Sequence, residues 1–536
     1  MSWRRAGRVL AGSALVLIPL AVLAIFFLLP LGGMLKHGLW QDGHVDFSAI
    51  SDVLTRRRER RVLWFTLWSS TVATALTLLL GVPVAYVLYR LRFPGRAALR
   101  AIVAIPFVLP TVVVGVAFRS LLATNGPLGG LGLDGSAAAI VAALVFFNVS
   151  VVARTVGTAW EALDGHPAEV AEGLGARPAY VLRTVTLPML RPAIASAATV
   201  VFLFCATAFG VVLTLGGLHY ATVETEIYLL TTQFLDLRAA AVLSLLQLAV
   251  VLVLLLIAAR AGSVATSRAV ARTRSPRRQD LPSLVTCGLV VAALLAPLVT
   301  LSVRSLRARG QWSLAGYRSL GTEVATALRN SLVTAGGATV LAVALGAVVA
   351  VLVTRRAPRR RLRQAQRLFD GAFMLPLGVS AVTIGFGFLI TLDSAPLDLR
   401  SSPALVIIAQ ALVGLPLVVR ILVPALRGVD EHLRESAAGL GAPPWRVLAT
   451  VDLPLVARPL LVAVGFAFAV AIGEFGATSF LARPDRPTLP VLIYRLIGRP
   501  GIENFQMALA ASVVLALITA AVMGLVEGLR ISGPKR

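Results

Sequence analysis

The sequence predicts an all-α polytopic membrane protein with about twelve transmembrane helices, arranged as two homologous halves of six. Composition supports this prediction first: the 536 residues are 57% hydrophobic and 14% charged, and the mean hydropathy is +0.86. Such a chain is too apolar for a soluble globular domain. The second support is a polar stretch beginning at Asp164 that recurs from Asp430, a constant shift of 430 − 164 = 266 positions.

Two polar stretches show the duplication most clearly. We call residues 164–192 the first island and residues 430–459 the second island. From Asp164 to Pro188, 15 of 25 positions are identical to those of the second island. Each island follows the fourth long apolar segment of its half and precedes the fifth. The islands therefore belong to two equivalent loops, at about 161–192 and 427–459.

Apolar segments long enough to cross a bilayer recur along both halves. The first follows Arg4, Arg5 and Arg8 and runs from about residue 9 to residue 31. It is longer than a signal-peptide core and lacks a small-residue cleavage site, so we expect a retained helix. The other expected spans are 62–89, 98–122, 138–158, 193–216, 238–259, 283–302, 328–354, 368–392, 403–426, 459–482 and 506–529.

Arginine-rich short loops indicate the cytoplasmic side. The richest follow spans two, six and eight, at residues 90–100, 260–278 and 355–367. Both islands fall on that side, together with the N- and C-termini. One arginine-rich segment, residues 55–61, disagrees with this topology, because it would lie on the extracytoplasmic side.

The duplication divides the chain into a first domain at 1–260, a polar and basic linker at 261–282 that we expect to be flexible, and a second domain at 283–536. Equivalent positions outside the islands support this division. Examples are Thr66 with Ser331, Gly81 with Gly346, Phe209 with Phe475, and Tyr228 with Tyr494.

Each island predicts a short helix with a defined start and end. Asp164 and Asp430 are placed to cap it, because their carboxylates accept free N–H groups of the first turn. Glycine readily adopts the positive φ of a helix C-terminal cap. The pairs that end the helices are Gly173 with Gly175, and Gly439 with Gly441.

An exposed leucine and a second short helix follow in each island. Leu174 and Leu440 are expected to project between the glycines as apolar knobs. Proline favours the first turn of a helix, so Pro178 and Pro444 open the second helix. A residue before proline disfavours helical backbone. We therefore expect the second helices to end before Leu187-Pro188 and Leu453-Pro454.

Composition also excludes several classes of function. Cys205 and Cys287 lie in apolar segments, which favours small core residues over a disulfide or metal pair. The net charge of +25 is spread between apolar segments without a basic soluble fold, so we expect no nucleic-acid binding. The only lysines, Lys36 and Lys535, stand in no GxxxxGK[ST] loop, so this chain supplies no P-loop ATPase site. We expect no cofactor.

Four residues inside the apolar segments are candidates for the translocation path. Pro106 and Pro376 break the third span of each half, which fits either a pathway-lining segment or simple helix packing. Asn148 fits a bond to a neighbouring helix as well as a contact with substrate. Glu474, whose first-half counterpart is Ala208, either faces the path or lies near the outer surface in contact with water.

The islands resemble the EAA loop of the permease subunits of binding-protein-dependent ATP-binding cassette (ABC) importers. Both keep its Glu, second Ala, Gly and later Leu-Pro, and both depart at the second letter, with Val170 and Ser436. In that family the loop forms coupling helices that dock into grooves on the ATPase subunits. The resemblance implies ATPase coupling for Glu169, Ala171, Gly173, Gly175, Leu187 and Pro188, and for Glu435, Ala437, Gly439, Gly441, Leu453 and Pro454.

The whole chain is similar to the fused permeases of the thiamine and ferric-iron importer group. The phrases that carry this similarity are Leu88 to Arg96, Phe146 to Asn148, Leu215 to Gly217, Ile227-Tyr228, Gly473 to Gly476 and Thr488 to Pro490. The similarity implies a multi-pass permease in the bacterial cytoplasmic membrane, in contact with lipid. It also implies two ABC ATPase subunits on the cytoplasmic side and an extracytoplasmic substrate-binding protein. Length and the Phe-Pro-Gly-Arg phrase favour thiamine, while ferric iron stays open.

Two other classes compete with an importer permease. A twelve-helix secondary transporter driven by an ion gradient also carries a basic motif where residues 90–100 stand, but it needs no repeated Gly and Leu-Pro islands. An intramembrane enzyme lacks support because the sequence has no HExxH and no GxSxG.

Overall fold

The structure is a computed structural model that describes residues 15–531 except 42, 218, 261–272, 309–310, 356–359, 393–398 and 400–401. The described chain is helical apart from two short hairpins. Within it, ten helices are long and apolar enough to cross a membrane, and a bent pair makes an eleventh. The prediction of an all-α polytopic membrane protein is confirmed. Arg4, Arg5, Arg8 and most of the expected linker lie outside the described residues.

The first half contains five long spans. A helix from Leu15 passes through the π turn η1 (Ala24–Leu28) into α2 (Leu29–Leu39), and is followed by α4 (Arg57–Arg90), α7 (Ala137–Glu161), α10 (Leu187–Ala206) and α13 (Leu237–Arg260). Shorter elements connect them: β1 (Trp40–Gln41), β2 (His44–Val45), α3 (Ser48–Thr55), α5 (Arg96–Ala104), η2 (Ile105–Phe107), α6 (Thr111–Leu122), η3 (Gly129–Leu131), α8 (His166–Gly173), α9 (Pro178–Val181), η4 (Leu182–Thr186), α11 (Gly210–Gly216) and α12 (Val223–Thr232).

The second half repeats this order. Its long helices are α14 (Leu281–Ser305), which η5 (Arg278–Asp280) precedes, α16 (Thr322–Thr354), α19 (Pro403–Arg427), α22 (Leu453–Gly473) and α25 (Ile502–Ile531). The shorter elements are β3 (Arg307–Ala308), β4 (Gln311–Trp312), α15 (Ala315–Arg318), α17 (Arg360–Met374), η6 (Leu375–Gly378), α18 (Ala381–Thr391), α20 (Glu431–Gly439), α21 (Pro444–Val447), η7 (Leu448–Asp452), α23 (Thr478–Leu481) and α24 (Leu489–Gly498).

The third span of each half, expected at 98–122 and 368–392, is broken at the predicted prolines. Helices α5 and α6 meet at 101° around η2. In the second half the polar helix α17 leads through η6 into α18, which has only 11 residues. Proline explains both breaks, because Pro106 and Pro376 have no N–H for the helical ladder and each starts a 3₁₀ turn.

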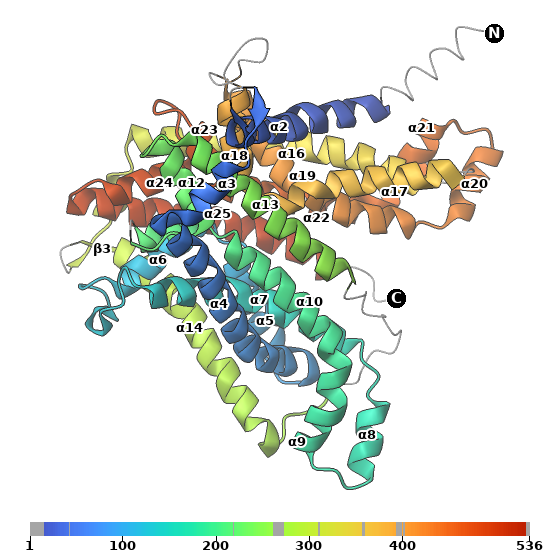
Figure 1. The fold of residues 1–536 in the computed structure, drawn as a ribbon. Coiled ribbons are helices and arrows are strands. Elements are labelled where there is room, and N and C mark those ends of the chain that lie inside the picture. The colour runs from blue at the N-terminus through green and yellow to red at the C-terminus, as the bar shows by residue number, and fades with distance from the viewer. Residues whose placement is uncertain are drawn as a thin grey trace, which may run out of the picture.

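The two halves interlock through their first helices. Helix α2 packs against α13 of its own half and also against α18 of the other half. Equivalently, α14 packs against α25 of its own half and against α4 and α6 of the first (Figure 1). Each half therefore packs against the first helix of its partner.

Close packing within each half is also duplicated. A Cβ added at Gly81 of α4 would lie 2.7 Å from side-chain atoms of Val152 on α7. The equivalent Gly346 of α16 stands in the same relation to Val418 on α19, at 2.6 Å. Glycine at these two positions lets the second and fourth spans of each half approach closely.

Buried hydroxyl groups support the short helices that follow the fifth spans. The Thr66 hydroxyl oxygen accepts a hydrogen bond from the Val223 N–H, at the start of α12, at 3.0 Å. The equivalent Ser331 accepts from the Leu489 N–H, at the start of α24, at 2.7 Å. Both hydroxyl residues are buried. Because the first N–H groups of a helix have no partner within it, these hydroxyls satisfy donors that the bilayer cannot.

We predict that Thr66→Val and Ser331→Ala each lower the melting temperature of the purified protein, because each leaves a buried N–H without a partner. The expected cost is about 1 to 3 kcal/mol per site. The matched control is Thr71→Val, since the exposed Thr71 bonds only to a carbonyl of its own helix, that of Leu67. Equal melting temperatures for Thr66→Val and Thr71→Val would contradict the capping role.

Candidate functional site

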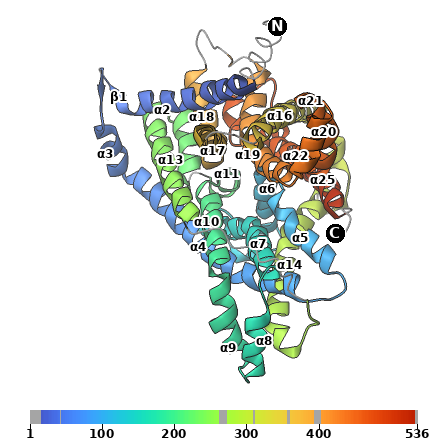
Figure 2. The same ribbon diagram turned by 90° about the vertical axis from the view of Figure 1, so that its right-hand side faces the viewer.

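The two islands lie at the ends of two diverging helical arms. In both views α8 and α9 form the tip of one arm, and α20 and α21 form the tip of the other (Figures 1 and 2). The first arm contains α4, α7 and α10, and the second contains α16, α19 and α22. The two islands therefore form two separate and equivalent tips.

Both predicted N-terminal caps are present. The Asp164 carboxylate accepts a hydrogen bond from the His166 N–H at 3.0 Å, where α8 begins. The Asp430 carboxylate accepts from the His432 N–H at 3.0 Å, in the first turn of α20. Glu169 lies in the first turn of α8, whereas Glu435 lies in the second turn of α20 with its side chain half exposed.

Both island helices end in the same hydrogen-bonded turn. The Ala176 N–H donates to the Ala171 carbonyl at 3.1 Å, and the Gly175 N–H donates to the Glu172 carbonyl at 3.0 Å. These are the two bonds of a Schellman motif. The second island repeats them, from Ala442 to Ala437 at 3.1 Å and from Gly441 to Ala438 at 2.9 Å.

The turn explains the glycines. Gly175 has φ of +86° and Gly441 has φ of +82°, values that favour glycine. A Cβ at either position would meet no atom within 4 Å. Backbone conformation, and not crowding inside this chain, therefore demands glycine there. Gly173 and Gly439 are the last residues of α8 and α20, and they are equally open.

The turns expose apolar side chains, as predicted. Leu174 is 85% exposed and Leu440 is 90% exposed, so neither packs against its own chain. Tyr180 and Trp445 at the start of the next helices are also exposed. An apolar cluster rimmed by polar residues is typical of a protein-binding surface.

The prediction that the second island helices end before Leu187-Pro188 and Leu453-Pro454 is wrong. The chain runs without interruption from α9 through the π turn η4 into α10, and from α21 through η7 into α22. Pro188 and Pro454 stand in the first turn of α10 and α22. The wider hydrogen-bonding pattern of the π turn accommodates the missing proline N–H. Each Leu-Pro thus marks a junction inside one long helix.

A buried ionic cluster anchors the second island. The Arg434 Nε donates to Asp452 at 2.6 Å, and its terminal nitrogens donate to Glu431 at 3.0 Å and to the Leu426 carbonyl at 2.8 Å. Arg355 reaches the other Asp452 oxygen at 3.1 Å. Although burial opposes the charged form, these hydrogen bonds raise the pKa of Arg434. The cluster ties α20 to the end of α16, to α19 and to the start of α22.

The first island is held differently. Ala168 and Thr186 occupy the positions equivalent to Arg434 and Asp452, 266 residues earlier. The ionic cluster therefore has no counterpart built from those two positions. The residues that are identical between the two islands do not reveal this difference in anchoring, because the cluster involves positions at which the islands differ.

The end of the linker is anchored beside the first arm. The Arg274 N–H donates to the Arg90 carbonyl at 3.1 Å, and its carbonyl accepts from the Arg92 N–H at 2.8 Å. Its guanidinium binds Asp280 at 2.8 Å, and Tyr86 donates to the same carboxylate at 2.6 Å. The expectation of a flexible linker is therefore wrong for residues 273–282, while 261–272 lie outside the described residues.

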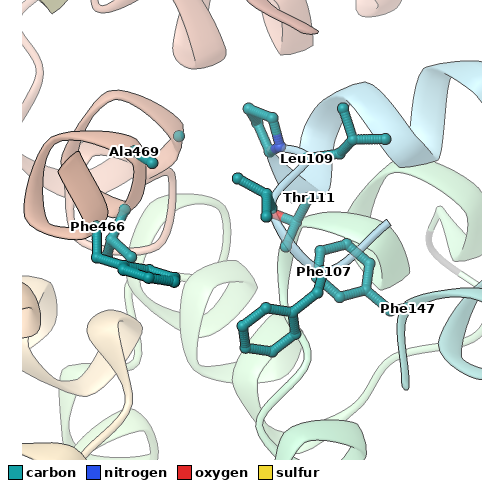
Figure 3. Close-up of a pocket in the computed structure, with 10 residues that line it drawn as sticks. Phe107, Leu109, Thr111, Phe147, Phe466 and Ala469 are labelled. Carbon is teal, nitrogen blue, oxygen red and sulfur yellow. The ribbon is translucent and has the colours of Figure 1, made fainter. Parts of the chain in front are cut away.

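The candidate path residues lie in different surroundings. Pro106 in η2 adjoins Phe107, which lines a cavity of about 170 Å³ between η2, α6 and α7 of the first half and α22 of the second (Figure 3). Pro376 lies in η6, which packs against α13, α17 and α19. The first-half break thus faces the space between the halves.

Glu474 and Asn148 both have structural partners. Glu474 is buried, and its carboxylate accepts from the N–H groups of Ala477 at 2.7 Å and Thr478 at 3.0 Å, so it caps α23. The alternative of a water-solvated surface position is wrong for Glu474. Asn148 is buried and donates to the Leu144 carbonyl at 2.8 Å, with Cys205 of α10 at 3.4 Å. The contact with Cys205 is the predicted bond to a neighbouring helix, because Leu144 lies on the same helix as Asn148.

An aromatic contact between the halves was missed at the level of sequence. Phe209 and Phe475, which are equivalent positions, stack with ring centroids 5.3 Å apart and an interplanar angle of 23°. Tyr228 contacts Phe209 at 5.4 Å, and Tyr494 contacts Phe475 at 5.5 Å. The sequence feature that could have predicted this contact is the recurrence of all four aromatic residues in the two halves.

A buried carboxylate linking the halves was also missed. Glu224 of α12 is fully buried and accepts from the Ser380 hydroxyl, at the start of α18, at 2.7 Å and from Gln247 at 3.2 Å. Two residues later, Glu226 binds Arg58. Two acids in one apolar segment were the signal for this site.

Comparison with known proteins gives a family match in each half. The family described as "Binding-protein-dependent transport system inner membrane component" matches residues 77–269 and 342–530. The chain is 29% identical to the thiamine transport system permease protein of Salmonella typhimurium over 494 residues, covering 87% of this chain and 88% of that protein. It is 29% identical to the permease of the same name from Brucella abortus over 538 residues, covering 94% and 93%.

Solved structures give a weaker likeness. A bacterial alginate ABC transporter in complex with an alginate pentasaccharide-bound periplasmic protein aligns with 50% of this chain and 99% of its own. The sequence identity is 18% and the TM-score is 0.42.

We predict that Asp452→Asn loosens the second island, because Arg434 and Arg355 lose the negative charge that they share. Amide hydrogen exchange in α20 should accelerate at least about tenfold, since removing one partner of a buried ion pair is strongly destabilising. Exchange in α8 should not change. The control is Thr186→Asn, at the equivalent position of the first half. Unchanged exchange in α20 would contradict the anchoring role of the cluster.

Proposed function

Because the chain belongs to the family of binding-protein-dependent transport system inner membrane components, we propose that it is the permease of a thiamine importer. Both halves match the family, so the chain is a fused, multi-pass inner-membrane permease. This family membership favours an importer over the ion-driven secondary transporter. Thiamine is proposed from the relatives of known name, which align over most of both chains.

We propose that each island docks into one ATPase subunit on the cytoplasmic side. The observation that carries this proposal is the pair of exposed leucines, Leu174 and Leu440, at the ends of two separate arms. An exposed leucine on a rigid turn gains stabilisation only when a partner covers it. Two equivalent tips suit two copies of one ATPase. A binding protein would then deliver substrate from the opposite, extracytoplasmic side.

The coupling residues would act by fixing the shape of the tips. Ala171 and Ala437 supply the carbonyls that close each turn, while Gly175 and Gly441 supply its left-handed backbone. Glu169 adds negative charge in the first turn of α8, which the helix dipole favours. Basic groups on an ATPase can meet Glu169 and the half-exposed Glu435. Gly173 and Gly439 leave the surface open to a partner, and Leu187-Pro188 and Leu453-Pro454 join the tips to α10 and α22.

ATP would drive transport by favouring one arrangement of the two arms. Closure of the ATPase dimer on ATP brings its two docking grooves together, and the islands move with them. A ligand can shift such an equilibrium only by its differential affinity for the two states. The energy of ATP therefore enters this chain through the island contacts.

We predict that the double variant Gly175→Leu/Gly441→Leu remains folded in the membrane but loses coupling between ATP hydrolysis and uptake. Leucine disfavours positive φ and would crowd a docked partner. Thiamine uptake into proteoliposomes containing all subunits should fall at least about tenfold, because strain and lost complementarity of about 1.4 kcal/mol suffice for that factor. The control is Gly43→Leu/Gly132→Leu, since both glycines have positive φ in open surroundings outside the islands. Undiminished uptake by the island variant would contradict the docking assignment.

The proposed function itself predicts an absolute requirement for partners. Proteoliposomes with this permease, its ATPase and its binding protein should accumulate thiamine only when ATP is supplied to the ATPase side. Omitting any one component should abolish uptake. Uptake by the permease alone on an ion gradient would overturn the proposal.

A further inference from the structure

The cavity lies between the two halves of the helix assembly. It is lined by Phe107, Thr111 and Phe147 from one side and by Phe466, Ala469 and Gly473 from α22 (Figure 3). The remaining wall is Val108, Leu109, Pro110 and Val470. Both halves of the duplication contribute, so the cavity depends on how the halves are packed together. Phe107 is 40% exposed, which leaves its ring accessible to a molecule entering the cavity.

The aromatic stack of Phe209 and Phe475 lies next to one end of the cavity. Gly210 lies against both Thr111 of the cavity wall and Phe475 of the stack. Gly473 of the opposite wall precedes Phe475 by two residues and lies against Pro110. Because α22 runs from the second island towards Phe475, the cavity lies on the island side of the stack. A molecule in it would be separated from the other side by the buried Phe209 and Phe475 rings.

The size of the cavity fits one aromatic ring. Its volume is about 170 Å³, and an apolar protein cavity of about 150 Å³ is known to hold benzene. The neighbouring space around Phe107 is open, so the rest of a two-ring molecule can extend out of the cavity. One aromatic ring is therefore a group that fits the cavity.

The chemistry of the lining selects the charge of the ligand. Three phenylalanine side chains line the cavity, and the π face of an aromatic ring attracts cations and stacks on other aromatic rings. Thr111 supplies the one polar side chain among the ten lining residues. A metal ion needs several oxygen, nitrogen or sulfur ligands, and this wall does not provide them. An aromatic organic cation satisfies both the size and the charge.

We propose that this cavity is a substrate-binding site within the permease, and that it holds one ring of thiamine in transit between Phe107 and Phe466. Thiamine joins an aromatic pyrimidine to a positively charged thiazolium, so it carries both features that the cavity selects. This inference rests on the proposed function, because it takes thiamine as the transported molecule. It adds a second recognition step after release from the binding protein.

The test is binding of radiolabelled thiamine to the full-length permease in lipid nanodiscs, without its partners. Wild-type protein should bind saturably. Phe107→Leu and Phe466→Leu keep apolar bulk but remove the π face, and each should raise the Kd about 5- to 30-fold, which corresponds to about 1 to 2 kcal/mol. The matched control is Phe47→Leu, at an exposed phenylalanine preceding α3 that should leave binding unchanged.

Two further measurements separate the outcomes. Ala469→Phe fills the cavity and should abolish binding, while melting curves report whether this variant folds. Replacing labelled thiamine by an analogue with an uncharged second ring should weaken binding to wild type by a similar factor. Absence of binding, or equal binding by wild type, Phe107→Leu and Phe466→Leu, overturns the cavity site. If the complete transporter still accumulates thiamine, the proposed function survives; if it does not, both proposals fail.

Discussion

A bilayer offers no water to the peptide backbone, so a helix that breaks inside it must find partners for its free N–H groups within the protein. Three short helices meet this constraint with side chains placed at their starts. Thr66 and Ser331 cap α12 and α24, and Glu474 caps α23. Because these side chains satisfy the free N–H groups at the breaks, the chain can bend where the two halves meet. The aromatic stack and the cavity occupy that meeting place.

The duplicated scaffold is not symmetric in its buried charges. Glu224 and Glu226 of the first half correspond to Pro490 and Leu492 of the second, and Glu474 corresponds to Ala208. Glu224 bonds across to Ser380 of the other half, whereas Glu474 is satisfied by its own half. The interface between the halves is therefore held by different polar contacts in the two halves.

Sequence reasoning succeeded where structure depends on neighbouring residues. The caps at Asp164 and Asp430, the turns at Gly175 and Gly441 and the exposed leucines follow from chemistry within a few positions of the chain. It failed where contacts join distant segments. Three contacts depend on tertiary packing. They are the packing of α2 and α14 against the opposite halves, the pairing of Arg434 with Asp452, and the stack of Phe209 on Phe475. The continuous helix through Leu187-Pro188 was missed for another reason, because a π turn offsets the local penalty of proline.

Helix α22 connects the features on which transport would depend. At its start, Asp452 fixes the second island through Arg434, and towards its end Phe466 lines the cavity, with Phe475 in the stack just beyond. A helix of 21 residues spans about 30 Å. The second island and the cavity wall therefore lie on one continuous helix, with the stack two residues beyond its end. On the other side, α10 leads from the first island to Phe209, but the Arg434–Asp452 anchor is replaced there by Ala168 and Thr186. The two arms thus meet at one stack while differing in the contacts that tie each arm to its island.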